Sequence, residues 1–410
     1  MNTFLKYRLI VIKGLCLFIS VVFLSGCWDS LDIEKRAVVL GIAIDKTTEE
    51  HGKEEENVSH LSNSFPRPDN EMIKITAQIA VPGKIPLGPE SGGGDSDPVW
   101  ILEVVGHTMD DALANLEQEI SDDIFLGHLR IIIISEELAR DGVERINDFF
   151  RRNSEVRRTA WLAISKGEAS QFMKITPTFE RVPGLYLSSM FENAVDLGKF
   201  PSDFIGEFWT ILSSKGQDSF LPYISIKKEE NVQIKGLAYF SGEKMVGISD
   251  PLEIGFFMAV LGNGKGGYGV FVQIPDSEED YVMVRISSRV VKIETKIKDD
   301  QPEITVNINY EAEIDEKDAP EYVEIDDSKI LKEIEEVTSK NTVESIQTFI
   351  KNTQEQESDI FGFGEHIRAK HPGFWDTKVK TPEKWHSLYR DLNVTVNCTT
   401  KIRRIGMKAK

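Results

Sequence analysis

The residue with the clearest chemistry in this chain is Cys27, whose thiol stands at the end of the first apolar segment. Basic residues come first in the chain, and a stretch of apolar or small residues follows them from 14 to 24. A basic start, a short apolar core and small residues before a cleavage point are typical of a secretory signal peptide. We therefore predict that residues 1–26 are a signal peptide and that cleavage leaves Cys27 as the first residue.

The three residues before Cys27 are similar to the bacterial lipobox, in which a diacylglyceryl group is attached to the cysteine thiol. They are Leu24, Ser25 and Gly26. Two acyl chains anchor a protein stably, whereas one chain binds a membrane only marginally. We expect Cys27 to carry the lipid and to hold the protein on a membrane outside the cytoplasm. The alternative is a transmembrane anchor, but Lys13 interrupts the apolar segment and no stop-transfer pattern follows it.

The charge of the chain is unevenly distributed. The formal net charge is −19, and this acidic balance argues against nucleic acid as a partner. Basic residues nevertheless outnumber acidic ones between 365 and 410. This basic end could contact anionic lipid headgroups or an acidic partner surface, or it could be a solvated tail.

No pattern in the chain nominates a catalytic, metal-binding or cofactor-binding residue. Residues 262–267 spell G-x-G-x-x-G, but a predicted strand follows them where a dinucleotide site needs a helix N-terminus. Of the 7 histidines only His366 and His371 are close together, and their spacing is not that of a zinc site. Cys398 is the one thiol left after processing and lipidation, so no intramolecular disulfide can form. We therefore expect no cofactor, no metal and no enzymatic activity.

Large aromatic residues gather near the basic end. Phe361 and Phe363 alternate with glycines, and Trp375 and Trp385 follow within 25 residues. Such residues pack into a core more often than they form a protein-contact surface, and both interpretations are kept.

Strands and helices alternate in the first half of the chain. Continuous apolar runs predict buried strands at 37–44 and 129–134, and periodic segments predict helices at 109–120 and 142–152. From about 220 onward, alternating β-branched segments predict antiparallel hairpins.

A long helix is predicted near the C-terminus over 329–351, with a bend or break near 339–341, before a final strand at 393–403. We predict an α+β protein with several domains, in which a mixed α/β N-terminal region precedes an antiparallel sheet with a long helix. The predicted units are a signal peptide at 1–26, an N-terminal α/β domain at 27–215, a small β-rich middle domain at 216–275 and a C-terminal α+β domain at 276–410.

Several short segments become informative when their order is considered. They are 26–29, 39–45, 127–130 with 135–139, 149–161, 235–240 with 245–247, and 359–364 with Trp375 and Trp385. Each segment alone is a weak signal. Together, over nearly the whole mature chain, they resemble the Ger(x)C family, the lipoprotein C subunits of spore germinant receptors.

The resemblance implies a mixed α+β protein held on the outer face of the spore inner membrane. There it would act with a polytopic, transporter-like B subunit and a second membrane subunit, A, in a receptor that senses nutrients and triggers germination. The C subunit of this family is not known as an enzyme.

Four basic residues in the resembling segments could act in one of two ways. His128 and Arg130 flank a predicted buried strand, where they could satisfy polar groups, and Arg157 and Arg158 could pair with local carboxylates. Direct contact with a partner is the alternative for all four.

Two further classes of protein compete with the receptor subunit. A lipid-anchored solute-binding protein of an importer would also carry a lipobox, but it would usually show two similar α/β lobes around a hinge. A cell-wall hydrolase would need a catalytic constellation, and the sequence presents none.

Overall fold

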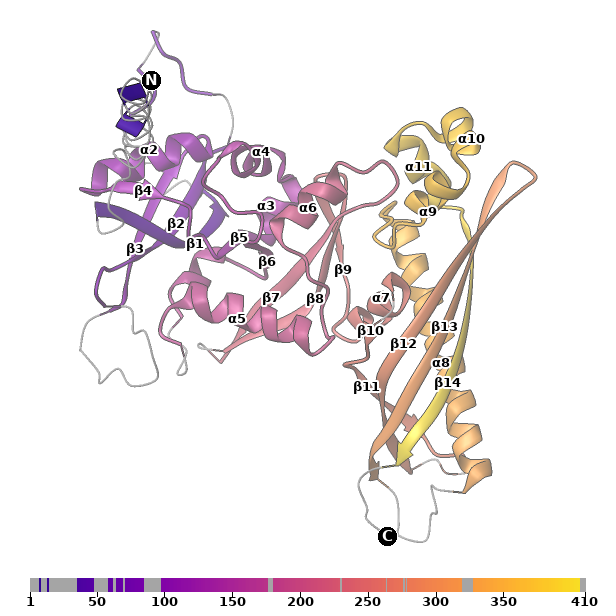
Figure 1. Cartoon of the computed structure of the whole chain (residues 1–410). Coiled ribbons are helices and arrows are strands. Elements are labelled where there is room, and N and C mark those ends of the chain that lie inside the picture. Colours follow the sequence, from indigo (N-terminus) through magenta and orange to yellow (C-terminus); the bar gives the residue numbers. More distant parts are fainter. Residues whose placement is uncertain are drawn as a thin grey trace.

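The computed structural model describes residues 7–8, 13–14, 35–47, 58–61, 64–68, 71–84, 97–175, 180–228, 231–262, 264–275, 277, 279–318 and 327–405. The lipobox and Cys27 lie outside these residues, so the predicted lipidation site has no structural description. Within the described residues no helix is long and apolar enough to cross a membrane. The described part contains two sheets, each with its own helices (Figure 1).

The first sheet has a parallel centre and antiparallel flanks. Its strand order is β3-β2-β1-β5-β6-β7-β8-β9, with β4 beside β1, and β1, β5, β6 and β7 run parallel. The strands are β1 (Arg36–Lys46), β2 (Ile73–Ala80), β3 (Val99–Gly106), β4 (Asp123–Phe125), β5 (Ile131–Ser135), β6 (Trp161–Ser165), β7 (Phe220–Lys227), β8 (Asn231–Ser241) and β9 (Lys244–Ile248). The central strands read as continuous apolar runs because helices cover both of their faces.

Successive side chains of the central strands enter different cores. Ile132 and Ile134 pack beneath α2 (Met109–Glu119), α3 (Glu136–Asp141), α4 (Glu144–Arg152) and α6 (Ile205–Leu212). Ile131 and Ile133 pack against the 3-10 helix η3 (Ala169–Met173) and α5 (Pro183–Asp196) on the other face. The period of two in the strands thus builds a three-layer α/β unit.

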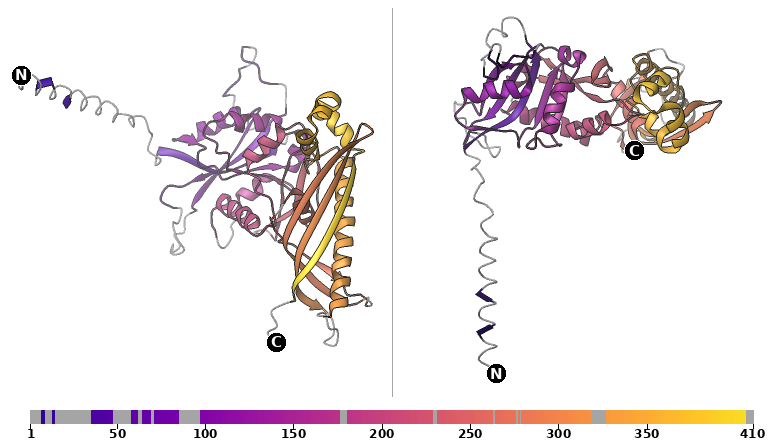
Figure 2. Two further views of the ribbon diagram at one scale, coloured as in Figure 1. Left: turned by 45° about the vertical axis from the view of Figure 1, so that its right-hand side comes forward. Right: turned by 90° about the horizontal axis from the view of Figure 1, so that it is seen from above.

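The second sheet is long and narrow, and one helix lies along it (Figure 2). Its order is β10-β12-β13-β14, with β11 also paired to β12. Its elements are β10 (Gly264–Lys265), β11 (Gly269–Gln273), β12 (Tyr281–Lys298), β13 (Gln301–Asp318), α8 (Ser328–Glu355), α9 (Phe363–Lys370), α10 (Pro372–Phe374), the π-helix η4 (Trp375–Val379), α11 (Pro382–Tyr389) and β14 (Asn393–Ile405). Pairing is antiparallel except between β13 and β14, which are parallel. The helices α8 to α11 connect these two strands and bring the chain back to the end of the sheet where β13 begins.

The predicted break in the long helix does not occur, since α8 is continuous from Ser328 to Glu355. The hydroxyls of Thr338 and Ser339 donate to backbone carbonyls four residues earlier, at 2.7 Å each. The backbone N–H of Thr400 on β14 also donates to the Ser339 hydroxyl. The polar residues that look like a break in the apolar pattern are therefore hydrogen-bonded within the packed helix.

The fold class predicted from the sequence is confirmed: a mixed α/β region precedes a mainly antiparallel sheet with a long helix. The separate middle unit predicted at 216–275 is not present as a sheet of its own. Its strands β7, β8 and β9 extend the first sheet through the pairing of Ile164 with Tyr223, whereas β10 and β11 pair with β12. The helix α7 (Glu253–Leu261) lies between the two groups of strands.

Candidate functional site

The aromatic residues singled out in the sequence meet where the two sheets join. Phe361, Phe363, Trp375 and Trp385 are all buried in one core cluster. The same cluster contains side chains of β7, β8, α7 and α8, so both sheets contribute to it. We call this region the joint.

Stacked and tilted rings connect the two parts of the joint. The ring centroids of Phe220 on β7 and Phe257 on α7 are 4.6 Å apart, and Phe257 lies 5.7 Å from Phe361. Phe361 stacks on Phe363 at 5.4 Å and meets Phe349 of α8 at 5.6 Å. These ring contacts form a continuous chain from β7 of the first sheet to the helices that pack on the second sheet.

A fully buried carboxylate, Asp359, lies at the centre of the joint. It accepts hydrogen bonds from the backbone N–H of Phe363 at 3.1 Å, from that of Gly364 at 2.8 Å and from the indole N–H of Trp385 at 2.9 Å. Burial, together with the charge of the nearby Asp218, raises the pKa of Asp359 to about 7 despite these donors.

Asp218 belongs to the first-sheet side of the joint and mirrors this arrangement. Its carboxylate accepts from the backbone N–H of Asp359 at 2.8 Å and of Gly242 at 3.1 Å, and lies 3.0 Å from Nε2 of His386. Burial opposes protonation of His386, but the hydrogen bond and charge of Asp218 prevail and raise the pKa of the imidazole. Two carboxylates and one imidazole thus tie the turn after β8 to α9 and α11.

Two glycines explain why the segment 359–364 can form this network. Gly362 adopts a left-handed φ of +71°, which places the start of α9 above Asp359. A Cβ on Gly364 would come within 2.5 Å of the Trp385 ring. Asp218 and His386 were missed by the sequence analysis, because they are 141 and 27 residues from Asp359 and no local pattern marks them.

The four predicted basic residues lie at the amino ends of β5 and β6 and in the turns before them. With Arg36 at the start of β1 they form what we call the basic edge, which comprises Arg36, His128, Arg130, Arg157 and Arg158. Arg130 is positioned by its backbone N–H, which donates to Leu40 at 2.9 Å, and by its carbonyl, which accepts from Trp161 at 2.8 Å.

Residues of the basic edge have different surroundings. Arg158 donates to the Gly206 carbonyl at 3.1 Å and the Thr210 hydroxyl at 3.3 Å, and its guanidinium lies 5.7 Å from the Trp209 ring. Arg130 and Arg157 are exposed and form no ion pair or side-chain hydrogen bond with the described part of the chain. Burial, then Arg157 and Arg130, lower the pKa of His128. Arg158 is therefore held by contacts within the protein, whereas the side chains of Arg130 and Arg157 are not.

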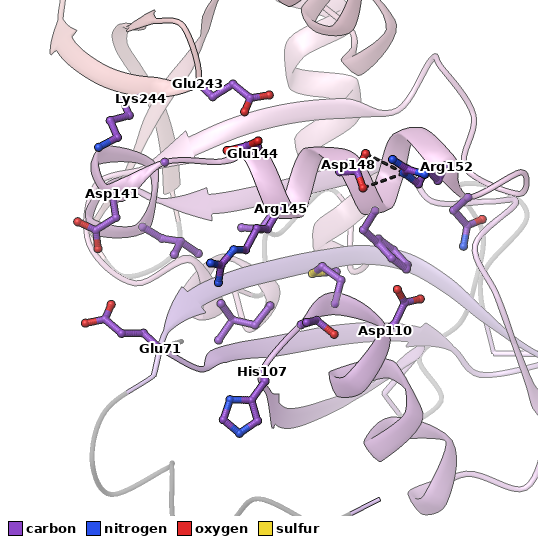
Figure 3. A pocket seen from close by; sticks show the side chains of 18 residues that line it. Glu71, His107, Asp110, Asp141, Glu144, Arg145, Asp148, Arg152, Glu243 and Lys244 are labelled. Carbon is purple, nitrogen blue, oxygen red and sulfur yellow. Dashed lines mark hydrogen bonds and ion pairs between the residues drawn. The ribbon is translucent and has the colours of Figure 1, made fainter. Parts of the chain in front are cut away.

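A polar hollow of about 960 Å³ lies between the ends of β2 and β9 and the helices α2, α3 and α4. Figure 3 shows the Arg145 side chain reaching toward its middle, with Glu71, Asp110 and Glu144 around it. Among the residues that the structure describes, no three His, Cys, Asp or Glu side chains are grouped to hold a metal ion. The hollow can receive polar or charged groups from a ligand or a partner.

Two family models match the chain in succession. The model described as "Spore germination protein N-terminal domain" matches residues 29–226, and "Spore germination B3/ GerAC like, C-terminal" matches residues 235–406. The second match begins within β8, so it includes strands that complete the first sheet.

Curated relatives match over almost their full length. Spore germination protein KC of Bacillus subtilis (strain 168) is 24% identical, and the alignment covers 96% of this chain and 95% of the relative. Spore germination protein A3 of the same organism is 28% identical over 97% of this chain and 98% of the relative. A solved structure described as the crystal structure of the GerBC protein aligns with a TM-score of 0.49 and 17% identity, covering 82% of this chain and 95% of that one.

Proposed function

This chain belongs to the Ger(x)C family of spore germination proteins, and from that membership we propose that it is the lipid-anchored C subunit of a nutrient germinant receptor. It acts with the membrane A and B subunits on the outer face of the spore inner membrane. Its role in this proposal is binding and assembly rather than catalysis.

The observation that carries the proposal is the order of three features along the chain. A lipobox ends at Cys27, the first family match begins at residue 29, and the second ends at 406. Relatives that match over nearly their whole length are described as spore germination proteins A3, B3 and KC. The predicted anchor and the two family matches therefore follow one another in order between residues 24 and 406.

Lipid anchoring has a physical consequence for assembly. An anchored protein is confined to one surface, so its effective concentration toward membrane partners rises without any new contact. The joint fixes the two units against each other, and the basic edge and the polar hollow remain as surfaces for recognition.

The anchor can be tested by replacing Cys27 with alanine and comparing Cys398→Ala, which changes the one other cysteine of the mature chain. We expect Cys27→Ala to lose most of its retention in the spore inner membrane and to weaken the nutrient response, because the two acyl chains are gone. Membrane fractionation and the rate of germination in nutrient measure the two effects. An unchanged nutrient response from a fully soluble Cys27→Ala protein would defeat the proposal that anchoring matters.

A further inference from the structure

The basic edge combines positive charge with two arginines, Arg130 and Arg157, whose side chains have no partner among the described residues. The basic edge is formed by three segments of the chain, at 35–36, 122–130 and 155–158. Together these segments contain five Lys or Arg residues, namely Lys35, Arg36, Arg130, Arg157 and Arg158, and three acidic residues, namely Asp122, Asp123 and Glu155. Glu155 already accepts a hydrogen bond from the backbone N–H of Leu126 at 2.9 Å. In a chain with a net charge of −19, this edge is a local reversal of sign.

Arg36 is half-buried, and one of its guanidinium N–H groups has no hydrogen-bond acceptor among the described residues. The Arg36 guanidinium lies 4.5 Å from the centroid of the Phe125 ring, and Phe125 in turn meets His128 edge to face. Nε of Arg36 is buried and finds no hydrogen-bond acceptor among the described residues. A buried donor without an acceptor is costly, so an anion that reached this position would be bound favourably.

The chain connects this edge directly to the predicted lipid. Arg36, at the start of β1, is the ninth residue after Cys27. Fully extended, nine residues span at most about 30 Å. The amino ends of the parallel strands are therefore held within a short distance of the bilayer, while the carboxyl ends lie at the opposite edge of the sheet.

We propose that the basic edge lies against the anionic lipid headgroups of the membrane and so sets the orientation of the anchored protein. The inference rests on the proposed lipidation of Cys27. Arg130 and Arg157 are free to donate to lipid phosphate, and guanidinium groups bind phosphate with paired hydrogen bonds. Most of the remaining chain, apart from the basic end at 365–410, is acidic and is repelled by the same surface, which favours one orientation over others.

A membrane explains these observations better than a soluble anion does, because the anchor keeps the edge beside lipid phosphates at all times. Each basic residue near an anionic membrane surface strengthens binding by about fivefold. Removing Arg130 and Arg157 together should therefore weaken the headgroup contact by about twentyfold or more.

The test uses the full mature, lipidated chain reconstituted in vesicles of phosphatidylcholine, with or without phosphatidylglycerol. Hydrogen–deuterium exchange is followed in peptides that cover 122–130 and 155–160. We expect exchange in both peptides to slow several-fold when phosphatidylglycerol is present. The double variant Arg130→Gln/Arg157→Gln should lose this protection.

A matched control removes the same charge at the other edge of the same sheet. Lys166 and Lys227 are exposed at the carboxyl ends of β6 and β7, so Lys166→Gln/Lys227→Gln should keep the protection. Equal exchange in the two kinds of vesicle, or protection that survives in the arginine variant, would overturn the proposal. Protection that inorganic phosphate alone reproduces, or that requires a partner protein, would overturn it in favour of a soluble anion or an acidic protein surface.

The failure of the anchor can be distinguished from the failure of this inference. The mass of the N-terminal peptide reports whether Cys27 carries a diacylglyceryl group, independently of exchange. A lipidated protein with an unprotected edge contradicts the orientation alone. A protein without lipid contradicts the proposed function first.

Discussion

The joint and the basic edge use charged residues in opposite ways. At the joint, Asp359 and Asp218 are buried, and each accepts hydrogen bonds from two or more N–H groups. At the basic edge, Arg130 and Arg157 are exposed and bond to no side chain of the described residues. Charge that is buried and satisfied positions the chain, whereas charge that is left unpaired at the surface is available to a partner.

The largest effect on the free energy of unfolding should come from removing a large buried side chain from the joint. Trp385 is fully buried and donates to Asp359, so Trp385→Ala removes a large side chain and one of the hydrogen-bond donors to this carboxyl group. We expect the free energy of unfolding to fall by about 4 kcal/mol in urea denaturation followed by circular dichroism. Trp100, which is 47% exposed, serves as the control, and Trp100→Ala should cost about 1 kcal/mol or less. Similar losses in the two variants would contradict the structural role of the joint.

The next effect concerns the protonation of Asp359. Its pKa is raised from 3.8 to about 7, so the folded protein keeps a proton that the unfolded chain has released between these values. Stability from this group is therefore highest at low pH and falls as the pH rises from about 4 to about 7. Asp359→Asn cannot titrate, and it should cost about 2 kcal/mol at pH 4 to 5, because an amide N–H now faces backbone donors.

The sign of this pH dependence gives a sharp comparison. Because only the wild-type protein loses the contribution of Asp359 on going toward pH 7, the difference between wild type and Asp359→Asn should shrink as the pH rises. His386, whose pKa is also raised, loses its contribution as the pH rises above its ordinary value of 6.5, and it does so in both proteins. A difference that stays constant or grows from pH 4 to pH 7 would show that Asp359 is ionised in the folded state at low pH.

The smallest effect separates two neighbours within the basic edge. Arg158 bonds to Gly206 and Thr210 and lies over Trp209, so Arg158→Ala should cost about 1 kcal/mol. Arg157 has no such contacts, and Arg157→Ala should change the free energy of unfolding by less than about 0.5 kcal/mol. Equal costs for the two substitutions would remove the distinction between a positioning arginine and one left free for recognition.

Local patterns predicted much of the fold correctly. The central strands of the first sheet are continuous apolar runs, as expected of strands buried on both faces. The aromatic residues of the segment 359–364 lie in a packed core, which is one of the two interpretations that the sequence allows. The strands of the range 216–275 are divided between the two sheets, because strand partners are set by contacts distant in the chain. The strand β7 pairs with β6, more than 50 residues earlier, and nothing local to either strand specifies that pairing.

The polar contacts of the joint cannot be predicted from local sequence patterns for the same reason. Asp218 and Asp359 meet across 141 residues, and His386 approaches Asp218 across 168. A single carboxylate in a sequence does not show whether it will be buried or solvated. The glycines at 362 and 364 were the one local signal, since they mark a turn and a close approach of the backbone to an aromatic ring.

The central claim is that this chain is the C subunit of a germinant receptor, and co-purification tests it most directly. The tagged full chain is isolated from detergent-solubilised spore inner membrane, and the proteins that accompany it are identified by mass spectrometry. We predict two polytopic membrane proteins, corresponding to the A and B subunits. Isolation of the chain alone, or together with an ATP-driven importer, would contradict the claim and favour a lipid-anchored solute-binding protein instead.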